Sequence, residues 1–224
     1  MLADIVREGP DEVWCLGDVV GYGAHPNECV DRTRTSAVVS LCGNHDLAAV
    51  GALDIAEFSG DAGAAVRWTQ TVLGDEQAAW LRTLAPSMRH AGVDLYHGSP
   101  RDPVWEYVLS EHVARLSFLA TPAPIVLVGH SHVALGLSWD GETTDGGLAP
   151  EGTDLDLARG RWLLNPGSVG QPRDGDPRAA WLLIDLDAGR ATFRRTPYPI
   201  AQAQAAIRAQ GLPEPLAARL AHGL

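Results

Sequence analysis

Four short polar segments of this chain each follow an apolar run, and each holds side chains that bind metals or transfer protons. They are Gly17-Asp18, Gly43-Asn44-His45-Asp46, His97-Gly98 and Gly129-His130-Ser131-His132. A short apolar run bounded by glycine and turn residues is typical of a buried strand. Because ligands of α/β folds bind beyond the carboxyl ends of strands, we expect the four polar segments to converge on one place.

Side chains of Asp, Asn and His offer oxygen and nitrogen ligands, which suit Mn²⁺, Fe, Zn²⁺ or Mg²⁺ better than ions that prefer thiolates. A carboxylate can bridge two ions, and two such ions clamp the attacking and the leaving oxygen of a phosphoryl displacement. On a strand, the spacing of His130 and His132 would send both rings to the same face, so that both reach metal. The pattern is therefore typical of a metal centre, and phosphoryl transfer is one chemistry that such a centre performs.

Each segment alone has a simpler interpretation. A single histidine near a strand end is usually a hydrogen-bonded core or surface residue, and Gly-Asp marks turns in many proteins. Four such segments at four successive strand ends favour the metal centre over coincidence. The remaining histidines lack this setting and are interpreted as structural or solvated: His25, His90, His112 and His222.

The cysteines and several tryptophans are given structural interpretations. Three cysteines are too few for a disulfide framework, and they are expected to fill the core: Cys15, Cys29 and Cys42. Three tryptophans are expected to pack in helices rather than to stack on a base: Trp68, Trp80 and Trp105.

The composition limits the classes of function. The chain has 224 residues, enough for one sizeable core, and its net charge of −11 argues against binding to duplex nucleic acid. All 17 residues counted as lysine or arginine are arginine, which excludes Schiff-base chemistry at a lysine. We find neither an apolar run of bilayer length nor a signal peptide at the N-terminus. We therefore expect a cytoplasmic protein that does not bind membranes.

Predicted strands and helices alternate along the chain, which favours the α/β class. Strands are predicted at 12–17, 37–43, 93–100, 124–132 and 161–170, with a hairpin over 178–196, while the apolar run 133–139 leads into a loop. Helices are predicted at 26–34, 59–73, 75–84 and in the tail from about residue 200, with a break near "GLPEP". The Asp/Gly/Thr-rich stretch from 140 to about 157 is expected to be a mobile surface loop.

The ordered motifs "GDVVGYG", "GNHD", "YHGSP" and "GHSH" resemble those of the calcineurin-like metallophosphoesterases. "GYG" followed by "PNE", and the later "NPGSVGQPRDGDPRA", are similar to the compact bacterial branch of that family. The resemblance runs along the whole chain. It implies a four-layer αββα sandwich of two mixed sheets in a single domain, 1–224, with a helical cap inserted around 50–90.

The resemblance also implies the composition of the centre. The metal ligands would be Asp18, Asn44, His97, His130 and His132. Asp18 would bridge two ions, and His132 would bind the ion that the other ligands do not complete. His45 would donate a proton to the leaving oxygen, oriented by an acidic neighbour, while a metal-bound hydroxide attacks phosphorus in line. The cofactors would be two divalent ions, with Mn²⁺ first and Fe, Zn²⁺, Ni²⁺ or Mg²⁺ as alternatives.

The "NPGS…R" segment is expected to shape a phosphate pocket through Asn165, Ser168 and Arg173. An arginine fork suits phosphate oxygens. The alternative for Arg173 is an ion pair at the surface with Asp174 or Asp176.

The sequence departs from the family pattern near its start. The family opens with a strand that ends in Asp-x-His and supplies most ligands of one metal, but no such pair precedes Gly17-Asp18. Residues 1–9 look like the second half of the helix that follows this strand, so roughly 20 residues are expected to be missing. A start codon placed too late is the favoured explanation, ahead of a truncation or a degenerate first site. We then expect one firmly bound ion, and either poor solubility or a homo-oligomer paired through the open sheet edge.

The leading hypothesis is therefore a metal-dependent phosphoesterase that acts on small phosphorylated substrates, either phosphodiesters or phosphomonoesters. Phosphoproteins and dinucleoside polyphosphates remain open as substrates, because the motifs do not determine specificity. The alternative hypothesis is a degenerate, non-catalytic regulatory module that binds a metal or a nucleotide, because the first metal site is incomplete.

Overall fold

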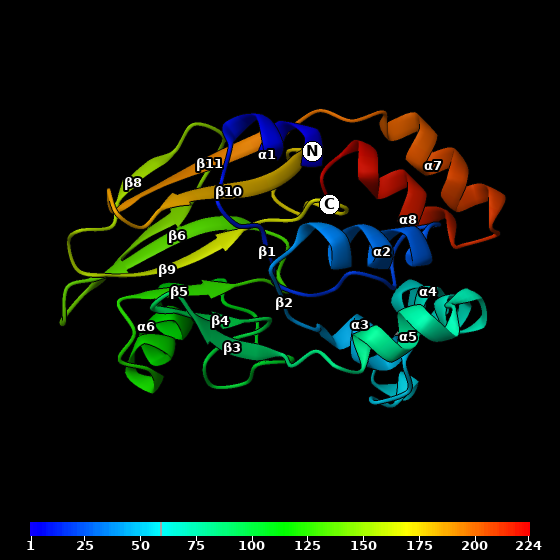
Figure 1. Ribbon diagram of the computed structural model, residues 1–224, viewed down its shortest axis with the longest axis horizontal. Helices are drawn as coiled ribbons and strands as arrows, with labels where there is room; N and C mark the ends of the chain where they lie inside the picture. The colour runs from blue at the N-terminus through cyan, green and yellow to red at the C-terminus, as the bar shows by residue number, and fades with distance from the viewer. Residues whose placement is uncertain (59) are drawn as a thin grey trace.

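The computed structural model describes residues 1–58 and 60–224 and shows an α/β protein with mixed sheets (Figure 1). The strands are β1 (Trp14–Cys15), β2 (Val39–Ser40), β3 (Ser87–His90), β4 (Val93–Tyr96), β5 (Ile125–Val128), β6 (Ala134–Trp139), β7 (Thr144–Leu148), β8 (Asp154–Asp156), β9 (Arg161–Pro166), β10 (Ala179–Asp185) and β11 (Arg190–Thr196). The helices are α1 (Leu2–Glu8), α2 (Pro26–Ser36), α3 (Asn44–Ala49), α4 (Gly60–Val72), α5 (Asp75–Leu81), α6 (Glu111–Ala120), α7 (Ile200–Ala209) and α8 (Glu214–Ala218). Two 3₁₀ turns complete the set, η1 (Ile55–Glu57) and η2 (Arg219–Ala221). The expected α/β class is therefore confirmed.

The strands form three sheets. The largest has six strands in the order β3-β4-β5-β9-β6-β7, parallel from β4 to β9 and antiparallel at both ends. A three-stranded antiparallel sheet has the order β10-β11-β8, and β1 pairs in parallel with β2. The hairpin predicted over 178–196 is confirmed as β10 and β11.

The central strands of the six-stranded sheet are buried on both faces, which explains why they are continuous apolar runs. In β5, Val126 belongs to a buried cluster with Phe118 of α6. Its neighbour Leu127 faces the other way and belongs to a cluster with Val39 of β2 and Ala191 of β11. One core therefore joins all three sheets, and it fixes the strands that precede the polar segments relative to one another.

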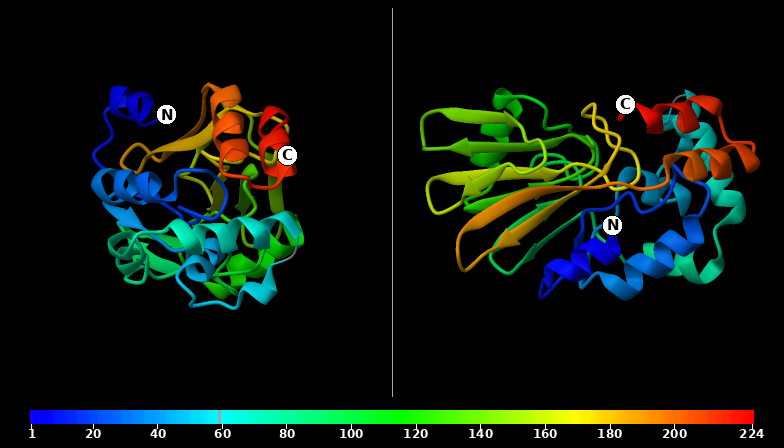
Figure 2. Two further views of the ribbon diagram at one scale, coloured as in Figure 1. Left: turned by 90° about the vertical axis from the view of Figure 1, so that its right-hand side faces the viewer. Right: turned by 90° about the horizontal axis from the view of Figure 1, so that it is seen from above.

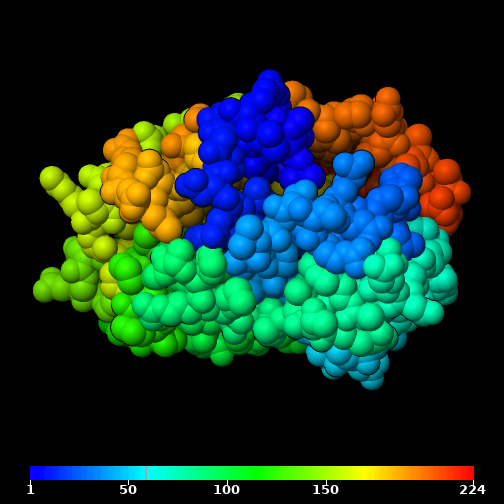
Figure 3. All heavy atoms as spheres, viewed as in Figure 1, coloured from blue at the N-terminus to red at the C-terminus, as the bar shows by residue number. Residues whose placement is uncertain are grey.

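Most helices gather at one end of the sheets, beyond the loops that carry the polar segments (Figures 1 and 2). There Leu220 of η2 lies in a buried cluster with Ala65 of α4 and Leu216 of α8. Helix α1 instead lies on the surface beside β11 (Figure 3), where Glu8 Oε2 is 3.8 Å from Arg194 Nη2. No helix of the described residues is both long and apolar enough to cross a bilayer.

The stretch after β6 contradicts the predicted mobile loop, because it contains β7 and β8. Strand β7 pairs with β6 from Leu135–Leu148 to Trp139–Thr144. It is a mostly exposed edge strand, and its Gly146 lies too close to the backbone of Gly136 for a side chain to fit. Such a strand has no apolar alternation, so the pattern in the sequence gave no signal for it.

Three smaller expectations were also wrong. Strands β1 and β2 are much shorter than the runs predicted at 12–17 and 37–43. The edge strand β3 was not predicted, because only its ends are partly buried. Cys29 is exposed on α2, whereas Cys42 is buried as expected.

Several expectations stay predictions. The start of the second predicted helix, residue 59, lies outside the described residues, but α4 occupies the rest of that range. The predicted cap around 50–90 contains η1, α4 and α5 and reaches β3, and nothing tests its role in specificity. The four-layer arrangement, the single domain, the missing first strand, the oligomer and the cytoplasmic location are likewise untested.

The β3–β4 hairpin provides a test of this backbone. The register His90–Val93 leaves Ala91-Gly92 as a two-residue turn, with φ angles of 47° and 80°. Two positive φ angles favour Asn-Gly, since alanine is strained in the left-handed region. We expect Ala91→Asn to raise the free energy of unfolding by about 1 kcal/mol in urea denaturation. Ala205→Asn, on the exposed face of α7, should instead lower it by about 0.5 kcal/mol. Equal or opposite shifts would contradict the turn geometry.

Candidate metal centre

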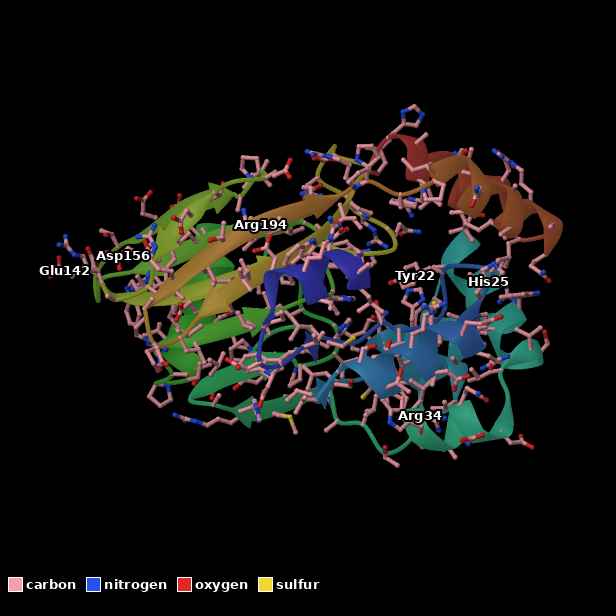
Figure 4. All side chains as sticks on the ribbon, turned by 45° about the horizontal axis from the view of Figure 1, so that its top comes forward. Tyr22, His25, Arg34, Glu142, Asp156 and Arg194 are labelled. Atoms are coloured by element: carbon pink, nitrogen blue, oxygen red, sulfur yellow. The ribbon has the colours of Figure 1, made fainter. Side chains whose placement is uncertain are left out.

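Asp18 directly follows the turn after β1, and its side chain is only 5% exposed. The Tyr22 hydroxyl donates a hydrogen bond to Oδ2 at 2.6 Å, and the backbone N–H of His45 donates to Oδ1 at 3.1 Å. Figure 4 shows Tyr22 far from the opposite end of the sheets, which is marked by Glu142 after β6 and Asp156 at the end of β8. The carboxylate is thus held from both oxygens within the loops between sheets and helices.

Left-handed backbone is concentrated at this place. Among the described residues other than glycine, only four have a positive φ: Asp18 (57°), Ala91 (47°), His130 (59°) and His132 (61°). Each such residue costs on the order of 1–2 kcal/mol, and strain of this kind collects at functional sites. The expectation that His130 and His132 share a strand is wrong, because both lie in the loop after β5. The left-handed turns, not strand alternation, direct their rings.

The orientation of His97 leaves one nitrogen available to a cation. Its Nδ1 lies 2.8 Å from the carbonyl oxygen of Leu16, which can only accept, so Nδ1 carries the proton. The lone pair of Nε2 then faces Asn44 Oδ1 at 3.2 Å and Asp18 Oδ1 at 3.5 Å. His130 Nδ1 lies 3.2 Å from the same nitrogen.

These residues fit a divalent cation. Ligand atoms of Asp18, His97 and His130 all lie within 4.8 Å of one another. Around an ion with bonds of about 2.1 Å, neighbouring ligand atoms are separated by about 3 Å, close to the distances that the site shows. Buried acceptors that face one another without a donor are costly, and a cation at their centre removes that cost. The three side chains therefore form a group that could hold a metal.

His132 approaches the other side of the same carboxylate. Its Nδ1 lies 2.8 Å from the carbonyl oxygen of Gln171, which fixes the proton there. Its Nε2 lies 3.8 Å from Asp18 Oδ2, whereas His97 faces Oδ1. The carboxylate thus lies between His97 and His130 on one side and His132 on the other, the arrangement that a bridging ligand requires.

His45 is held beside the centre by a backbone carbonyl, not by the expected acidic neighbour. Its Nδ1 lies 3.2 Å from the oxygen of Gly21, and its ring stacks on Tyr22 with centroids 4.0 Å apart. Phe58 contacts the ring edge-on at 5.0 Å. No hydrogen bond to its Nε2 occurs among the described residues.

The acidic neighbour Asp46 has a different task. Its carboxylate accepts from the backbone N–H of Val20 at 3.0 Å and of Gly43 at 2.9 Å. It therefore joins the loop after β1 to the start of α3. Burial, followed by the negative charge of Asp18, raises the pKa of Asp46 to about 7.

Burial and charge set the protonation states of the centre. Burial opposes ionisation of Asp18, but the imidazoles of His97 and His45 outweigh it and hold the pKa of Asp18 well below its usual range. Burial also lowers the pKa of His45 to about 4, while burial and His97 lower that of His130 to about 3. Burial and Asp18 raise the pKa of Tyr22 well above 10, so its hydroxyl stays a donor. Asp18 is therefore ionised, and His45 and His130 are neutral at neutral pH, the forms that bind metals.

Aromatic residues surround the histidines, and the sequence did not predict them. Tyr107 lies flat on His130, with centroids 4.0 Å apart and planes 4° apart. Trp105 stands edge-on to His130 at 6.4 Å and touches Phe58. The expectation that Trp105 packs in a helix is wrong, since it lies in the loop before α6. Tyr22 had a local signal, its position in "GDVVGYG", but Tyr107 had none.

Asn165 and Ser168 position loops, and their side chains use their polar atoms internally. Asn165 Nδ2 donates to the carbonyl oxygen of Gly129 at 2.6 Å and to Ser131 Oγ at 3.0 Å. Its Oδ1 accepts from the N–H of Gly167 at 2.9 Å. Asn165 therefore anchors the loop that carries both histidines. Ser168 Oγ accepts from the N–H of Gln171 at 3.0 Å, which shapes the turn beside His132.

Arg173 lies near the centre and is not part of a surface ion pair. Its Nη2 donates to Gln171 Oε1 at 2.8 Å, and its guanidinium lies 5.9 Å from the ring centroid of Tyr22. The alternative interpretation is wrong, since Asp174 pairs with Arg195 and Asp176 with Arg178. Contact of Arg173 with a substrate stays a prediction.

Comparison with known proteins agrees with this site. A model of the calcineurin-like phosphoesterase superfamily domain matches residues 1–189. The uncharacterized protein MJ0912 of Methanocaldococcus jannaschii is 34% identical over 225 residues, covering 98% of this chain and 90% of that protein. The crystal structure of a metallophosphoesterase from Sphaerobacter thermophilus has 41% identity and a TM-score of 0.89, covering 100% of this chain and 93% of that one.

A more distant structure shares the fold alone. The hypothetical protein PH1004 from Pyrococcus horikoshii OT3 has a TM-score of 0.77 at 20% identity, covering 100% of this chain and 90% of that one. Taken together, the family model and the relatives show that this chain belongs to the calcineurin-like phosphoesterase superfamily, a family of metal-dependent hydrolases. The predicted family is therefore confirmed.

Gly43 is a position where the centre tolerates no side chain. A Cβ atom there would collide with Asp18 Oδ1 and lie 2.5 Å from His97 Cε1. We expect Gly43→Ala to lower the free energy of unfolding by about 1–3 kcal/mol and to weaken Mn²⁺ binding in calorimetry. The matched control is Gly23→Ala, where a Cβ atom would meet nothing within 4 Å. Equal metal affinity in the two variants would contradict the crowded geometry.

The buried imidazoles predict acid sensitivity of the metal-free protein. An unfolded chain protonates His45 and His130 near pH 6.5, whereas the native protein resists until about pH 4 and 3. Each of these histidines should therefore lower the stability as the pH drops from about 6.5 to 4, by up to about 1.4 kcal/mol per unit, while proton uptake by native Asp46 below about pH 7 offsets one of them. Urea unfolding in EDTA at several pH values measures this slope. His45→Gln should lower this slope by the contribution of one proton. His25→Gln, at the exposed start of α2, should leave the slope unchanged.

Proposed function

We propose that this protein is a metal-dependent phosphoesterase that hydrolyses phosphodiesters or phosphomonoesters of small molecules. The observation that carries the proposal is the convergence of Asp18, His97 and His130 in one buried group. These residues come from three separate loops, in a chain that belongs to a family of metal-dependent hydrolases. A cation held by these residues would remove the cost of burying acceptors that face one another.

The ligand roles follow from the geometry of the site. One ion would be held by four residues: Asp18, Asn44, His97 and His130. The ligand atoms of the other three lie 3.2–3.5 Å from His97 Nε2. A second would lie between Asp18 Oδ2 and His132, and fewer ligands make it the weaker site. Divalent ions, with Mn²⁺ first and Fe, Zn²⁺, Ni²⁺ or Mg²⁺ as alternatives, would neutralise phosphoryl charge and acidify a water molecule.

His45 is the candidate proton donor to the leaving oxygen. Its Nδ1–H is directed to the carbonyl of Gly21, so Nε2 is the nitrogen that carries the transferred proton. With a pKa of about 4 the free ring is neutral. A phosphate anion entering beside it favours the charged imidazolium, so substrate binding itself loads the proton. Stacking on Tyr22 keeps the ring in place during the transfer.

The test compares two histidines with different roles. Hydrolysis of bis(4-nitrophenyl) phosphate should depend on added Mn²⁺. His130→Ala should weaken metal binding, and excess Mn²⁺ should restore part of the rate. His45→Ala should keep the metal content and lower kcat by roughly 10²–10⁴-fold, with smaller losses for esters that have good leaving groups.

The outcomes separate the candidate functions. Equal losses in His45→Ala across leaving groups of different pKa would exclude its role as proton donor. Absence of turnover with every divalent ion, despite tight metal binding, would instead favour the non-catalytic regulatory module.

A further inference from the structure

Two arginines near the metal centre, Arg173 and Arg219, have no Asp or Glu partner among the described residues, and Arg219 Nε donates to the oxygen of Leu224, the last residue of the chain. No Asp or Glu side chain within residues 1–58 and 60–224 lies within 4.0 Å of either guanidinium. The chain has 28 acidic residues against 17 basic ones, so acids are abundant. By contrast, Arg195 of β11 is paired with Asp174. Guanidinium groups without a carboxylate side chain beside them, and partly shielded from water, are typical of sites that bind anions.

Arg219 is fixed in place by contacts on two sides. It begins η2, whose Leu220 is 5% exposed and lies in a cluster against which Ala24, near Tyr22, packs. On the other side the N–H of Gly175 donates to the carbonyl oxygen of Gly223 at 3.0 Å. The red end of the chain accordingly lies beside the yellow loop before β10 in two views (Figures 1 and 2).

The electrostatic surroundings of Arg219 agree with the position that these backbone contacts give to the C-terminal turn. Burial, followed by the positive charge of Arg173, lowers the pKa of Arg219, while Tyr22, Asp61 and Tyr107 act in the other direction. Tyr22 is the residue bonded to Asp18, and Tyr107 is the one stacked on His130. Arg219 therefore extends the centre toward the C-terminal turn.

Both guanidinium groups have unused donors. Gln171 Oε1 accepts from Nε and Nη2 of Arg173, and no hydrogen bond to its Nη1 occurs within residues 1–58 and 60–224. The Nε of Arg219 donates to the backbone oxygen of Leu224, and no hydrogen bond to its Nη atoms occurs among the described residues. The backbone N–H of Arg173 donates to the carbonyl of His132, which places Arg173 beside the metal centre.

We propose that Arg173 and Arg219 bind a second anionic group of the substrate, so that the preferred substrates carry another phosphate next to the scissile one. The inference rests on the proposed function, because the scissile phosphate is assigned to the metal centre. Arg219 lies outside residues 1–189, the part that the superfamily model matches. It is thus a specificity determinant that the shared motifs do not contain.

Binding of inorganic pyrophosphate to the metal-free protein tests the proposal by calorimetry. Arg219→Ala and Arg173→Ala should each weaken the affinity roughly 10- to 100-fold, the loss expected for a hydrogen-bonded charge. Arg219→Lys keeps the charge without the fork and should be intermediate. Asp61→Asn removes the nearby negative charge and should strengthen binding. The matched control is Arg208→Ala, because Arg208 is paired with Glu214 on the surface.

A kinetic experiment relates this binding to turnover. With Mn²⁺, Arg219→Ala should lower kcat/KM for ADP by a larger factor than for AMP, since only ADP has a second phosphate. Each factor is a ratio of variant to wild type on one substrate, so differences in leaving group cancel.

The two experiments fail in different ways. Absence of hydrolysis of any phosphate ester would overturn the proposed function, while pyrophosphate binding without metal would still report on the arginines. Unchanged pyrophosphate affinity in Arg219→Ala, with an unaltered circular dichroism spectrum, would overturn the present inference even if the enzyme is active. An altered spectrum makes Arg219→Lys the deciding variant, and wild-type affinity there would overturn the role of the fork.

Discussion

The carboxylate of Asp18 is buried, charged and held in a left-handed turn, and much of the structure around it serves these three conditions. Its oxygens accept from the Tyr22 hydroxyl and the His45 backbone. Removing a carboxylate from water costs several kcal/mol unless charges and hydrogen bonds compensate. Two donors alone compensate only part of that cost, so the surrounding imidazoles, and an ion between them, complete the arrangement.

Close approach of backbone segments is the second constraint, and it follows from the first. The loop that carries Asp18 meets the start of α3 so closely that Gly43 has no room for a side chain. Gly21, with a φ of 94°, approaches the His45 ring in the same way, and its carbonyl orients that ring. Asp46 then joins both loops through two backbone N–H groups. The glycines in the motifs thus permit contacts that the ligands need.

The residues that contact the ligands determine the orientation of each ligand. Backbone carbonyls of Leu16 and Gln171 fix the protons of His97 and His132, so that both rings turn their free nitrogens to Asp18. Asn165 holds the loop between His130 and His132 from a different strand. The C-terminal turn, bonded to the Arg173 loop through Gly175 and Gly223, carries a further arginine, Arg219, although the chain as a whole has a net charge of −11. A strongly acidic protein can therefore attract an anion, because charge near the site outweighs net charge at a distance.

The sequence by itself determined which residues stand at the strand ends. Apolar runs followed by glycine place Asp18, His97 and His130 there, because a strand buried on both faces must be apolar and must end in a turn. The β10–β11 hairpin could also be predicted from the sequence, since its turn and flanking apolar runs are local features. Only the tertiary structure decided what surrounds those residues. Tyr107 on His130, the carbonyls that fix the imidazole protons, and the exposed strand β7 all depend on contacts between distant segments. Such contacts leave no periodic trace in the sequence, because they depend on side-chain directions and backbone turns that packing selects.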